Sequence, residues 1–269
     1  MLIFVVLQSP AERSFTMLAI ERKNEILNKL RAEQRVLVNE LALHYGVTEE
    51  TIRRDLDKLE KEGYATKTYG GAIWGNNTKL DLSYTVRNKT NVEAKTSIAK
   101  VISEMVCDGD HLMLDDSSTS LYVAKELKDK SNLTIITYSA EIVAELAGVE
   151  GFHILCTGGQ LRPGSLAFEG HQVPAVLSRY HVDKAILSCK GIDAKAGITD
   201  SAETHALSKQ AMIRAAKHAI LAVDSTKFDK VSFVQVSPLN QLQTVVTDQL
   251  PTLQWEKLFR EQGITVIHP

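Results

Sequence analysis

Short runs of apolar residues recur along the second part of the chain, and each run is bounded by Gly, Asp, Ser or Asn. Between two of them, the apolar residues of segment 98–106 return at i, i+3, i+4, i+7 and i+8, which is the period of a helix. Buried strands that alternate with amphipathic helices are typical of a parallel sheet covered on both faces. We therefore predict an α/β domain with a largely parallel sheet, whose strands contain residues 112–114, 133–136, 154–155, 185–187, 219–223, 245–246 and 265–267.

Before residue 75 the pattern is different, because charged side chains are frequent and the apolar period is helical. We predict three helices there. The first spans Ile20–Arg31, the second follows Val38 with Asn39 as a candidate N-cap, and the third begins at Thr48, a natural N-cap. The side chains expected in their core are Ile26, Leu27, Leu30, Leu41, Ala42, Tyr45, Ile52, Leu56 and Leu59.

The second and third helices have the spacing of a helix-turn-helix. Ala42 is small enough for two helices to meet at a sharp angle, and Gly46 suits the tight turn between them. Val47 and Ile52 supply the apolar contacts behind that turn. Segment 64–71 alternates like a small hairpin, which would form a wing. The N-terminal domain is therefore expected to be a mostly helical winged helix-turn-helix that binds double-stranded DNA.

The third helix has a polar face opposite its apolar stripe. The adjacent residues Arg53 and Arg54 could reach guanine edges or phosphates in a major groove. The alternative is a solvated face on which Arg53 pairs with Asp57. Glu49 and Glu50 would repel phosphates, and they either favour the helix dipole or accept a hydrogen bond from a cytosine. The residues expected to contact DNA are Thr48, Glu50, Thr51, Arg53, Arg54, Lys58, Lys67 and Tyr69.

Composition places the chain among ordinary globular proteins. Its 269 residues are 44% apolar and 24% charged, which excludes the disordered, collagen-like and coiled-coil classes. The net charge of −2 requires any contact with nucleic acid to be local. Three cysteines without a Cys-x-x-Cys motif indicate neither a disulfide framework nor a zinc site. No apolar run approaches the roughly 18–20 residues of a membrane span, so we expect a soluble protein of the reducing cytoplasm.

These patterns divide the chain into parts. Residues 1–16 have an apolar start without the features of a signal peptide, and we interpret them as an extension outside the fold. The alternative is a strand or arm packed on a partner. Residues 17–75 would form the DNA-binding domain, 76–94 a polar linker, and 95–269 the α/β domain.

The loops after the predicted strands carry the candidate ligand chemistry, because an open parallel sheet binds ligands at the carboxyl ends of its strands. Segment 115–120 reads Asp-Asp-Ser-Ser-Thr-Ser and opens a helix, whose first N–H groups and dipole would attract an anion. Plain N-capping by Ser or Thr is the alternative. Loops 158–162, 188–193 and 224–227 add glycines, an arginine and lysines, so we expect a small, polyhydroxylated, anionic ligand.

The motifs of the third helix and the wing resemble those of the DeoR family of bacterial regulators of sugar catabolism. The family signature contains Thr-Ile-Arg-Arg-Asp-Leu, which this chain keeps whole at 51–56, and Tyr-Gly-Gly-Ala follows at 69–72. The chain departs from the family at Tyr69, where His is usual, and at Lys67, where Arg is common. Both departures lie in the wing.

The resemblance extends through the α/β domain. The DeoR sensor domain is similar in fold to ribose-5-phosphate isomerase and binds phosphorylated sugars. Most members have Gly-Thr-Thr at positions 117–119, and the Ser-Ser-Thr found here, with the Ser-Cys-x-Gly-Ile-Asp run at 188–193, looks more like the L-fucose operon activator branch. That branch suggests a deoxyhexulose 1-phosphate as effector. The effector contacts that the resemblance implies are Asp115, Ser117, Ser118, Thr119, Arg162, Lys190, Gly191, Asp193, Lys209, Asp224 and Lys227.

We therefore predict a transcriptional regulator, a repressor of a sugar-utilisation operon, whose DNA affinity changes when a phosphorylated sugar binds. No metal or other cofactor is expected. The expected partners are operator DNA, the effector, and further copies of the chain in a homodimer or homotetramer, since one helix-turn-helix per chain suits a two-fold operator.

Two alternatives remain open at the level of sequence. One is a sugar-phosphate isomerase-like enzyme with an appended DNA-binding domain, whose base would be Asp115, Asp116, Asp193 or Glu203. No spacing marks a matched acid and base among these residues. The other is a structural DNA-binding protein, which the near-neutral charge and the ligand-like loops disfavour.

Overall fold

The computed structural model describes residues 18–61, 64–74, 84–249 and 252–269. The chain divides into two compact units, residues 1–76 and 77–269. The extension predicted over residues 1–16 lies outside the described residues. No described helix is long and apolar enough to cross a membrane.

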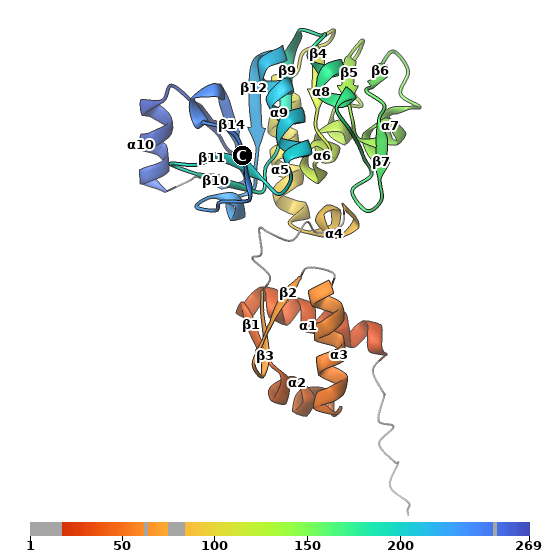
Figure 1. Ribbon diagram of the computed structural model, residues 1–269, viewed down its shortest axis with the longest axis vertical. Coiled ribbons are helices and arrows are strands. Elements are labelled where there is room, and N and C mark those ends of the chain that lie inside the picture. Colours follow the sequence, from red (N-terminus) through yellow and green to blue (C-terminus); the bar gives the residue numbers. More distant parts are fainter. Residues whose placement is uncertain (1–17, 62–63, 75–83, 250–251) are drawn as a thin grey trace, which may run out of the picture. The chain divides into compact units, whose positions relative to one another are not determined.

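The first unit packs three helices against a small antiparallel sheet, which is the arrangement of a winged helix-turn-helix (Figure 1). The sheet has the strand order β1-β3-β2, and the hairpin of β2 and β3 forms the wing. The elements are α1 (Ala19–Glu33), β1 (Arg35–Leu37), α2 (Val38–Tyr45), α3 (Glu49–Lys61), β2 (Ala65–Thr68) and β3 (Gly71–Trp74).

The predicted N-cap of the second helix is wrong. Helix α2 begins at Val38, so Asn39 lies inside the helix and Leu37 occupies the N-cap position in an extended conformation. Strand β1, which the apolar pattern does not predict, pairs with β3 and keeps the backbone extended up to Leu37. The core is otherwise close to the prediction, since Ile26, Leu30, Leu41, Ile52, Leu56 and Leu59 are buried while Leu27, Ala42 and Tyr45 are half-buried.

Two glycines make the tight turns of this unit possible. Gly46 ends α2 in the left-handed region with a φ of 62°, and its N–H donates to the carbonyl groups of Ala42 and Leu43. Gly71 begins β3 where that strand meets β1. A Cβ at position 71 would lie 2.1 Å from the carbonyl oxygen of Val36, so only glycine allows the two strands to approach.

A buried ion pair joins α1 to α3. The Nε of Arg22 donates to Oδ2 of Asp55 at 2.7 Å, and both side chains are less than a tenth exposed. Taking two charges out of water is costly unless they stay in close contact. The pair therefore fixes the position of α3 against α1, which no apolar pattern reveals.

The second unit is built on a seven-stranded parallel sheet. Each of the predicted apolar runs overlaps one strand of this sheet. From β4 the chain proceeds outward to β6, returns to β9 beside β4, and then proceeds to the opposite edge. In spatial order the strands are β15 (Thr265–Ile267), β14 (Thr244–Val246), β12 (Ala216–Ala222), β9 (Val182–Leu187), β4 (His111–Leu114), β5 (Thr134–Thr137) and β6 (His153–Cys156).

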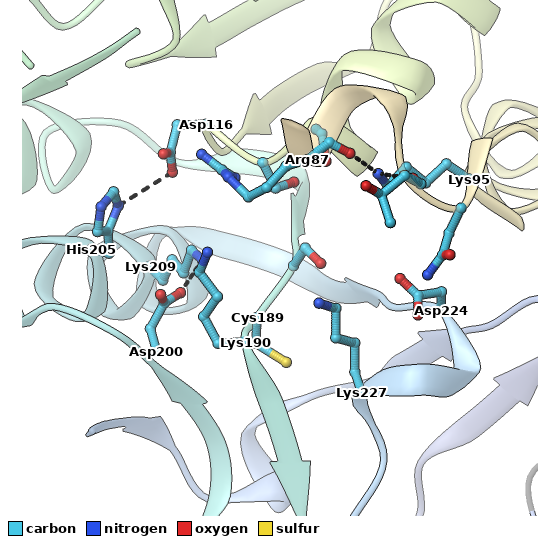
Figure 2. Close-up of a pocket in the computed structure, with 15 residues that line it drawn as sticks. Arg87, Lys95, Asp116, Cys189, Lys190, Asp200, His205, Lys209, Asp224 and Lys227 are labelled. Atoms are coloured by element: carbon cyan, nitrogen blue, oxygen red, sulfur yellow. Dashed lines mark hydrogen bonds and ion pairs between the residues drawn. The ribbon is translucent and has the colours of Figure 1, made fainter. Parts of the chain in front are cut away.

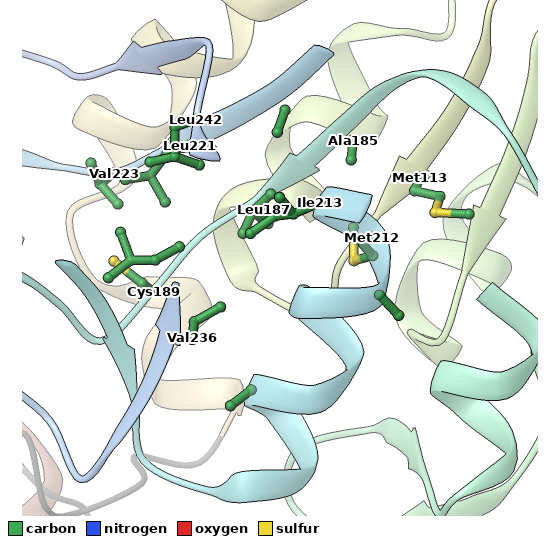
Figure 3. Packing of buried hydrophobic residues seen from close by; sticks show 14 of the residues in the cluster. Met113, Ala185, Leu187, Cys189, Met212, Ile213, Leu221, Val223, Val236 and Leu242 are labelled. Carbon is green, nitrogen blue, oxygen red and sulfur yellow. The ribbon is translucent and has the colours of Figure 1, made fainter. Parts of the chain in front are cut away.

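Helices cover both faces of this sheet, as predicted. Successive side chains of a strand point to opposite faces, so Leu112 and Leu114 belong to one core while Met113 belongs to the other. Figure 3 shows the second core, where Met113, Ala185 and Leu187 pack near residues of α9. The first face is covered by α5 (Val92–Met105), α6 (Ser118–Glu126) and α7 (Ala140–Leu146), and the second by α8 (Gln172–Leu177), α9 (Glu203–Ala215) and α10 (Leu253–Glu261).

Two antiparallel parts of this unit are not predicted by the apolar pattern. Their strands have three or four residues each and little continuous apolar content, so they lack a readable period. They are a hairpin of β7 (Gln160–Arg162) and β8 (Ala167–Glu169), and a sheet of β10 (Gly191–Asp193), β11 (Gly197–Asp200) and β13 (Val234–Ser237), with short 3-10 turns at η1 (Ser225–Lys227) and η2 (Leu239–Gln241).

Part of the predicted linker is helical. Helix α4 (Tyr84–Lys89) and the first turn of α5 precede the predicted boundary at residue 95. Tyr84 is only 3% exposed and packs in the core of the second unit, which fixes α4 there. A six-residue helix is too short to show an amphipathic period, so the sequence alone does not reveal it. Residues 76–83 of the predicted linker lie outside the described residues.

Candidate DNA-binding surface and ligand cavity

Helix α3 has one buried face and one exposed face. Ile52 and Leu56 are fully buried, whereas Arg53, Arg54 and Lys58 are exposed. Tyr69, at the tip of the wing between β2 and β3, is also fully exposed. A side chain that contacts DNA must be exposed in this way. Of the predicted DNA contacts, the exposed ones are Thr48, Glu50, Arg53, Arg54, Lys58, Lys67 and Tyr69, and Thr51 is half-buried.

Each arginine of α3 is held by an acid one turn earlier. Nη2 of Arg53 lies 2.6 Å from Oε2 of Glu49, and Nε of Arg54 lies 3.3 Å from Oε1 of Glu50. Exposed pairs of this kind contribute about 0.3–0.5 kcal/mol on a helix. A DNA phosphate could therefore displace either carboxylate at little cost.

The wing is tied to α3 by a separate ion pair. Lys67 of β2 bonds to Asp57 of α3, and this hydrogen bond raises the pKa of Lys67. The pairing of Arg53 with Asp57 that the sequence allowed is therefore not formed. Thr48 caps α3 as predicted, since its Oγ1 accepts a hydrogen bond from the N–H of Thr51 at 3.3 Å.

A polar cavity lies at the carboxyl ends of β4 and β9 in the second unit. The chain leaves these neighbouring strands toward opposite edges of the sheet, and open α/β sheets bind their ligands at such a switch point. The cavity encloses about 640 Å³, part of it open to solvent.

Besides Lys209 and His205, four basic side chains line this cavity, namely Arg87, Lys95, Lys190 and Lys227. They come from four separate segments, which are α4, α5, the loop after β9 and η1. Figure 2 shows Arg87 between a group containing Asp116 and a group containing Lys95 and Lys227. The cavity therefore offers positive charge from several directions.

Lys95 is the most deeply buried of these four cations, at 5% exposed. Its ammonium donates hydrogen bonds to the carbonyl oxygen of Arg87 and, at 2.6 Å, to that of Thr90. Burial lowers the pKa of Lys95 to about 7, with Asp224 opposing the shift and Lys227, Arg87 and Lys190 adding to it. An anion bound in the cavity would stabilise the charged form of Lys95, which burial and the neighbouring cations disfavour.

Two buried acid–base pairs form the opposite wall (Figure 2). Oδ1 of Asp116 lies 3.5 Å from Nδ1 of His205, and Oδ2 of Asp200 forms an ion pair with Nζ of Lys209. Burial alone disfavours all four charges, but the attraction within each pair is stronger. The pKa values of both carboxyl groups are therefore lowered, and those of His205 and Lys209 are raised.

Asp115 organises the loops around the cavity without lining it. This fully buried carboxylate accepts hydrogen bonds from the Oγ of Ser117 at 2.6 Å and of Ser120 at 2.5 Å. Its other oxygen accepts from the N–H of Ser188 at 2.9 Å and lies 3.4 Å from Lys209. One side chain thus joins the loop after β4, the loop after β9 and helix α9.

The structure brings some of the predicted effector residues together and not others. Arg162 pairs with Glu169 across the β7–β8 hairpin at 3.1 Å. Asp193 closes the turn after β10 by accepting from two backbone N–H groups, which lowers its pKa. Gly191 makes room for a carbonyl oxygen, since a Cβ there would lie 2.3 Å from that of Lys230. The predicted residues that line the cavity are Ser117, Ser118, Lys190, Lys209, Asp224 and Lys227, and those that do not are Asp115, Thr119, Arg162, Gly191 and Asp193.

Four charged residues of the cavity wall are not predicted from the sequence, namely Arg87, Lys95, Asp200 and His205, and Asp116 is predicted only as a candidate base of the isomerase alternative. None of them was read as a binding residue from the sequence, because they lie on helices or strands or beside a capping motif. The adjacent acids at 115–116 were the one signal that could have indicated a carboxylate at this place. Among the described residues, no three His, Cys, Asp or Glu side chains gather as a metal site.

Two family models match the chain. The DeoR-like helix-turn-helix domain matches residues 22–78, and the DeoR C terminal sensor domain matches residues 90–249, which is more than half of the chain. The chain belongs to the DeoR family. The resemblance drawn from the Thr-Ile-Arg-Arg-Asp-Leu motif is thereby confirmed, and so is the combination of a helix-turn-helix domain with an α/β sensor domain.

Relatives of this DeoR-family chain are named as regulators of transcription. The uncharacterized HTH-type transcriptional regulator YulB of Bacillus subtilis (strain 168) is 39% identical over 232 residues, which are 86% of this chain and 90% of the relative. The putative aga operon transcriptional repressor of Escherichia coli O157:H7 is 32% identical over 250 residues, 92% and 93% of the two chains. The L-fucose operon activator of Haemophilus influenzae is 33% identical over 228 residues, 85% and 91% of the two chains.

Among solved structures, ribose 5-phosphate isomerase A from Methanocaldococcus jannaschii aligns with a TM-score of 0.38 at 18% identity. The alignment covers 52% of this chain and 55% of the isomerase. The DeoR-family assignment therefore depends on the two family models and on the relatives.

Proposed function

We propose that this DeoR-family protein represses a sugar-utilisation operon and that a phosphorylated sugar in the cavity changes its affinity for operator DNA. The names of its relatives support the link to sugar operons, since one is a putative aga operon repressor and another an L-fucose operon activator. In this proposal α3 and the wing contact DNA, the cavity binds the effector, and two or four copies of the chain assemble on a two-fold operator.

The observation that carries the effector proposal is the mixed charge of the cavity. Arg87, Lys190 and Lys227 offer charged donors to a phosphate, each worth about 1.5–3 kcal/mol when well placed. The carboxylates of Asp116 and Asp200 in the same cavity can accept hydrogen bonds from hydroxyl groups. A ligand with one anionic group and several hydroxyls complements this lining. A plain apolar ligand or a free polyanion does not.

The same carboxylates favour binding over catalysis. A general base works best when its pKa is near the ambient pH. The pKa values of Asp116 and Asp200 are instead held below the usual range by His205 and Lys209. This arrangement supports a sensor that returns its ligand unchanged, and it disfavours Asp116 as the base of the isomerase alternative.

The DNA part of the proposal is tested at α3. Arg53→Ala and Arg54→Ala should each weaken operator binding by about 1–3 kcal/mol if the arginine reads a base. An arginine that only contacts phosphate would weaken all DNA sequences equally and reduce the salt dependence. Fluorescence anisotropy at several salt concentrations distinguishes the two cases. Lys100→Ala, on the exposed side of α5, is the control, and unchanged affinity in both arginine variants contradicts the proposal.

The effector part is tested with a panel of sugar phosphates, including a deoxyhexulose 1-phosphate, and with their unphosphorylated sugars. Thermal shift and calorimetry identify binders, and gel-shift titration measures operator release. Ser118→Glu places an anion at the start of α6 and should abolish the response while DNA binding persists. Ser118→Ala is the matched control and should keep the response.

The outcomes separate the candidate functions. If a free sugar releases DNA as well as its phosphate does, the phosphate part of the proposal is wrong. If NMR shows that the bound sugar phosphate is converted to an isomer, the enzyme alternative replaces the sensor. Recovery of the unchanged sugar phosphate, together with operator release, supports the proposed function.

A further inference from the structure

Helix α4 connects two parts of the chain that a regulator must couple. It is the first described element after β3, from which residues 75–83 separate it in sequence. It also contributes Arg87 to the cavity wall, and Thr90 and Asn91 after it line the cavity too. Helix α4 is therefore both a part of the cavity wall and the described element of the second unit that is nearest in sequence to the DNA-binding unit.

The contacts that hold α4 come mainly from the cavity and from α6. The ammonium of Lys95 holds the carbonyl groups of Arg87 and Thr90. The hydroxyl of Tyr122, on α6, donates to the carbonyl oxygen of Asn88 at 3.1 Å. The backbone N–H of Tyr84 donates to Gly164 at 2.7 Å.

Although Tyr84 packs in the core, three features oppose the docked position of α4. Tyr84 Oη and Asn88 Oδ1 are buried without a hydrogen-bond partner, and each such atom carries a desolvation cost. Asn91, at the joint between α4 and α5, has a φ of 50°, in the left-handed region that few residues adopt without strain. The ammonium of Lys95 is buried beside three other cations with Asp224 as its opposing charge.

We propose that α4 transmits the state of the cavity to the DNA-binding unit: an anion bound near Arg87 and Lys95 fixes α4 against α6, and its departure releases α4. The inference rests on the proposed function, because it takes the effector to be an anion. Physically, the anion balances the clustered positive charge, and the Lys95 ammonium then holds the end of α4 more firmly. Effector and docked α4 favour each other, as linkage requires.

Two conservative variants outside the anion-binding groups should act in opposite directions. Tyr122→Phe removes a hydrogen bond to α4 and should weaken binding of the effector by about two- to tenfold. Tyr84→Phe removes a buried hydroxyl that has no partner and should favour docked α4. It should shift the DNA affinity of the effector-free protein toward the value of the effector-bound protein. Tyr180→Phe, at an exposed tyrosine outside the cavity lining, is the control.

The readouts on the full chain are hydrogen–deuterium exchange of residues 84–95 and gel-shift titration with operator DNA. The probes are inorganic phosphate and the sugar phosphate that gives the largest thermal shift in the panel. In the wild type, saturating probe should slow exchange in α4. Tyr84→Phe should slow it without probe, and Tyr122→Phe should accelerate it.

The possible failures are distinguishable. If neither probe changes DNA affinity in the wild type, the proposed function and this inference fall together. If the wild type responds but α4 exchanges equally with and without probe, the inference alone is overturned. It is also overturned if both tyrosine variants match Tyr180→Phe in exchange and in DNA response.

Discussion

Asp115 positions the cavity through its neighbours. One carboxylate oxygen accepts hydrogen bonds from the hydroxyl groups of Ser117 and Ser120, and the other accepts one from the backbone N–H of Ser188. These hydrogen bonds hold the loops after β4 and β9 at a fixed separation. Lys209 supplies the balancing charge at 3.4 Å. Buried polar groups with all partners satisfied rigidify a site in this way.

Asp115→Asn should therefore lower both stability and effector affinity. The amide group would direct N–H donors at groups that are themselves donors, which leaves buried polar atoms unpaired at a cost of about 1–3 kcal/mol. Chemical denaturation and calorimetry with the selected sugar phosphate measure the two effects. Asp193→Asn, in an exposed turn, should leave effector affinity unchanged. Equal losses in both variants would show that Asp193 also acts on the ligand.

Lys95 predicts a bell-shaped dependence of effector affinity on pH. A phosphate monoester gains its second charge near pH 6, so affinity should rise as pH increases through about 6. The pKa of Lys95 is lowered to about 7. Above that pH the ammonium of Lys95 loses its proton in the free protein, so the positive charge that attracts the anion is lost and affinity should fall.

Calorimetric titrations between pH 5 and about 9 measure this curve. Lys95→Arg stays charged throughout, so its affinity should not fall above pH 7. If the affinity of this variant still falls above pH 7, the titration belongs to another group. His205 is a candidate, because it lines the cavity and its pKa is raised. A wild-type affinity that rises continuously to pH 9 would contradict the role of Lys95.

At the scale of elements, predictability follows the continuous apolar content of each segment. The inner strands of the parallel sheet are mostly buried, so their apolar runs are visible in the sequence. The strands of the β10–β11–β13 sheet are short and are held by backbone pairing and close approach at Gly191. Likewise, the predicted part of the cavity other than Lys209 comes from loops after apolar strands, whereas Arg87 and Lys95 are placed by α4 and α5. Their role depends on packing between elements, which no local pattern encodes.

The wing offers a test of packing at this scale. Gly71→Ala would bring a Cβ to within 2.1 Å of the Val36 carbonyl oxygen, so β1 and β3 must separate. We expect destabilisation of the first unit by about 1–3 kcal/mol, as for other overpacked sites. Differential scanning calorimetry and operator binding measure the effect. Gly148→Ala, which meets nothing within 4 Å, should be close to neutral, and equal stability of the two variants would refute the close approach.

At the scale of the whole molecule, the proposed assembly on a two-fold operator requires more than one DNA-binding unit. Each chain carries one winged helix-turn-helix, and such units read half-sites about 34 Å apart on one side of the duplex. Inserting five base pairs between the half-sites, which is about half a helical turn, should reduce affinity toward the level of non-specific binding. Inserting ten base pairs returns the two half-sites to the same side of the duplex and should restore affinity. Gel shifts with both operators check this, and equal affinity for them would indicate that one unit binds alone.

The strand order has a consequence for how the protein is made. Strand β4 pairs with β9, and Leu112 is opposite Lys184, which lies 72 positions later in the chain. Strands β4, β5 and β6, in contrast, pair in the order in which they follow one another along the chain. Contacts between distant residues slow folding, because the intervening chain must first be ordered. One half of the sheet can assemble during synthesis, but the cavity between β4 and β9 exists only after the later strands have emerged. Under the proposed function, a nascent chain therefore gains its effector site only after most of the second unit has been translated.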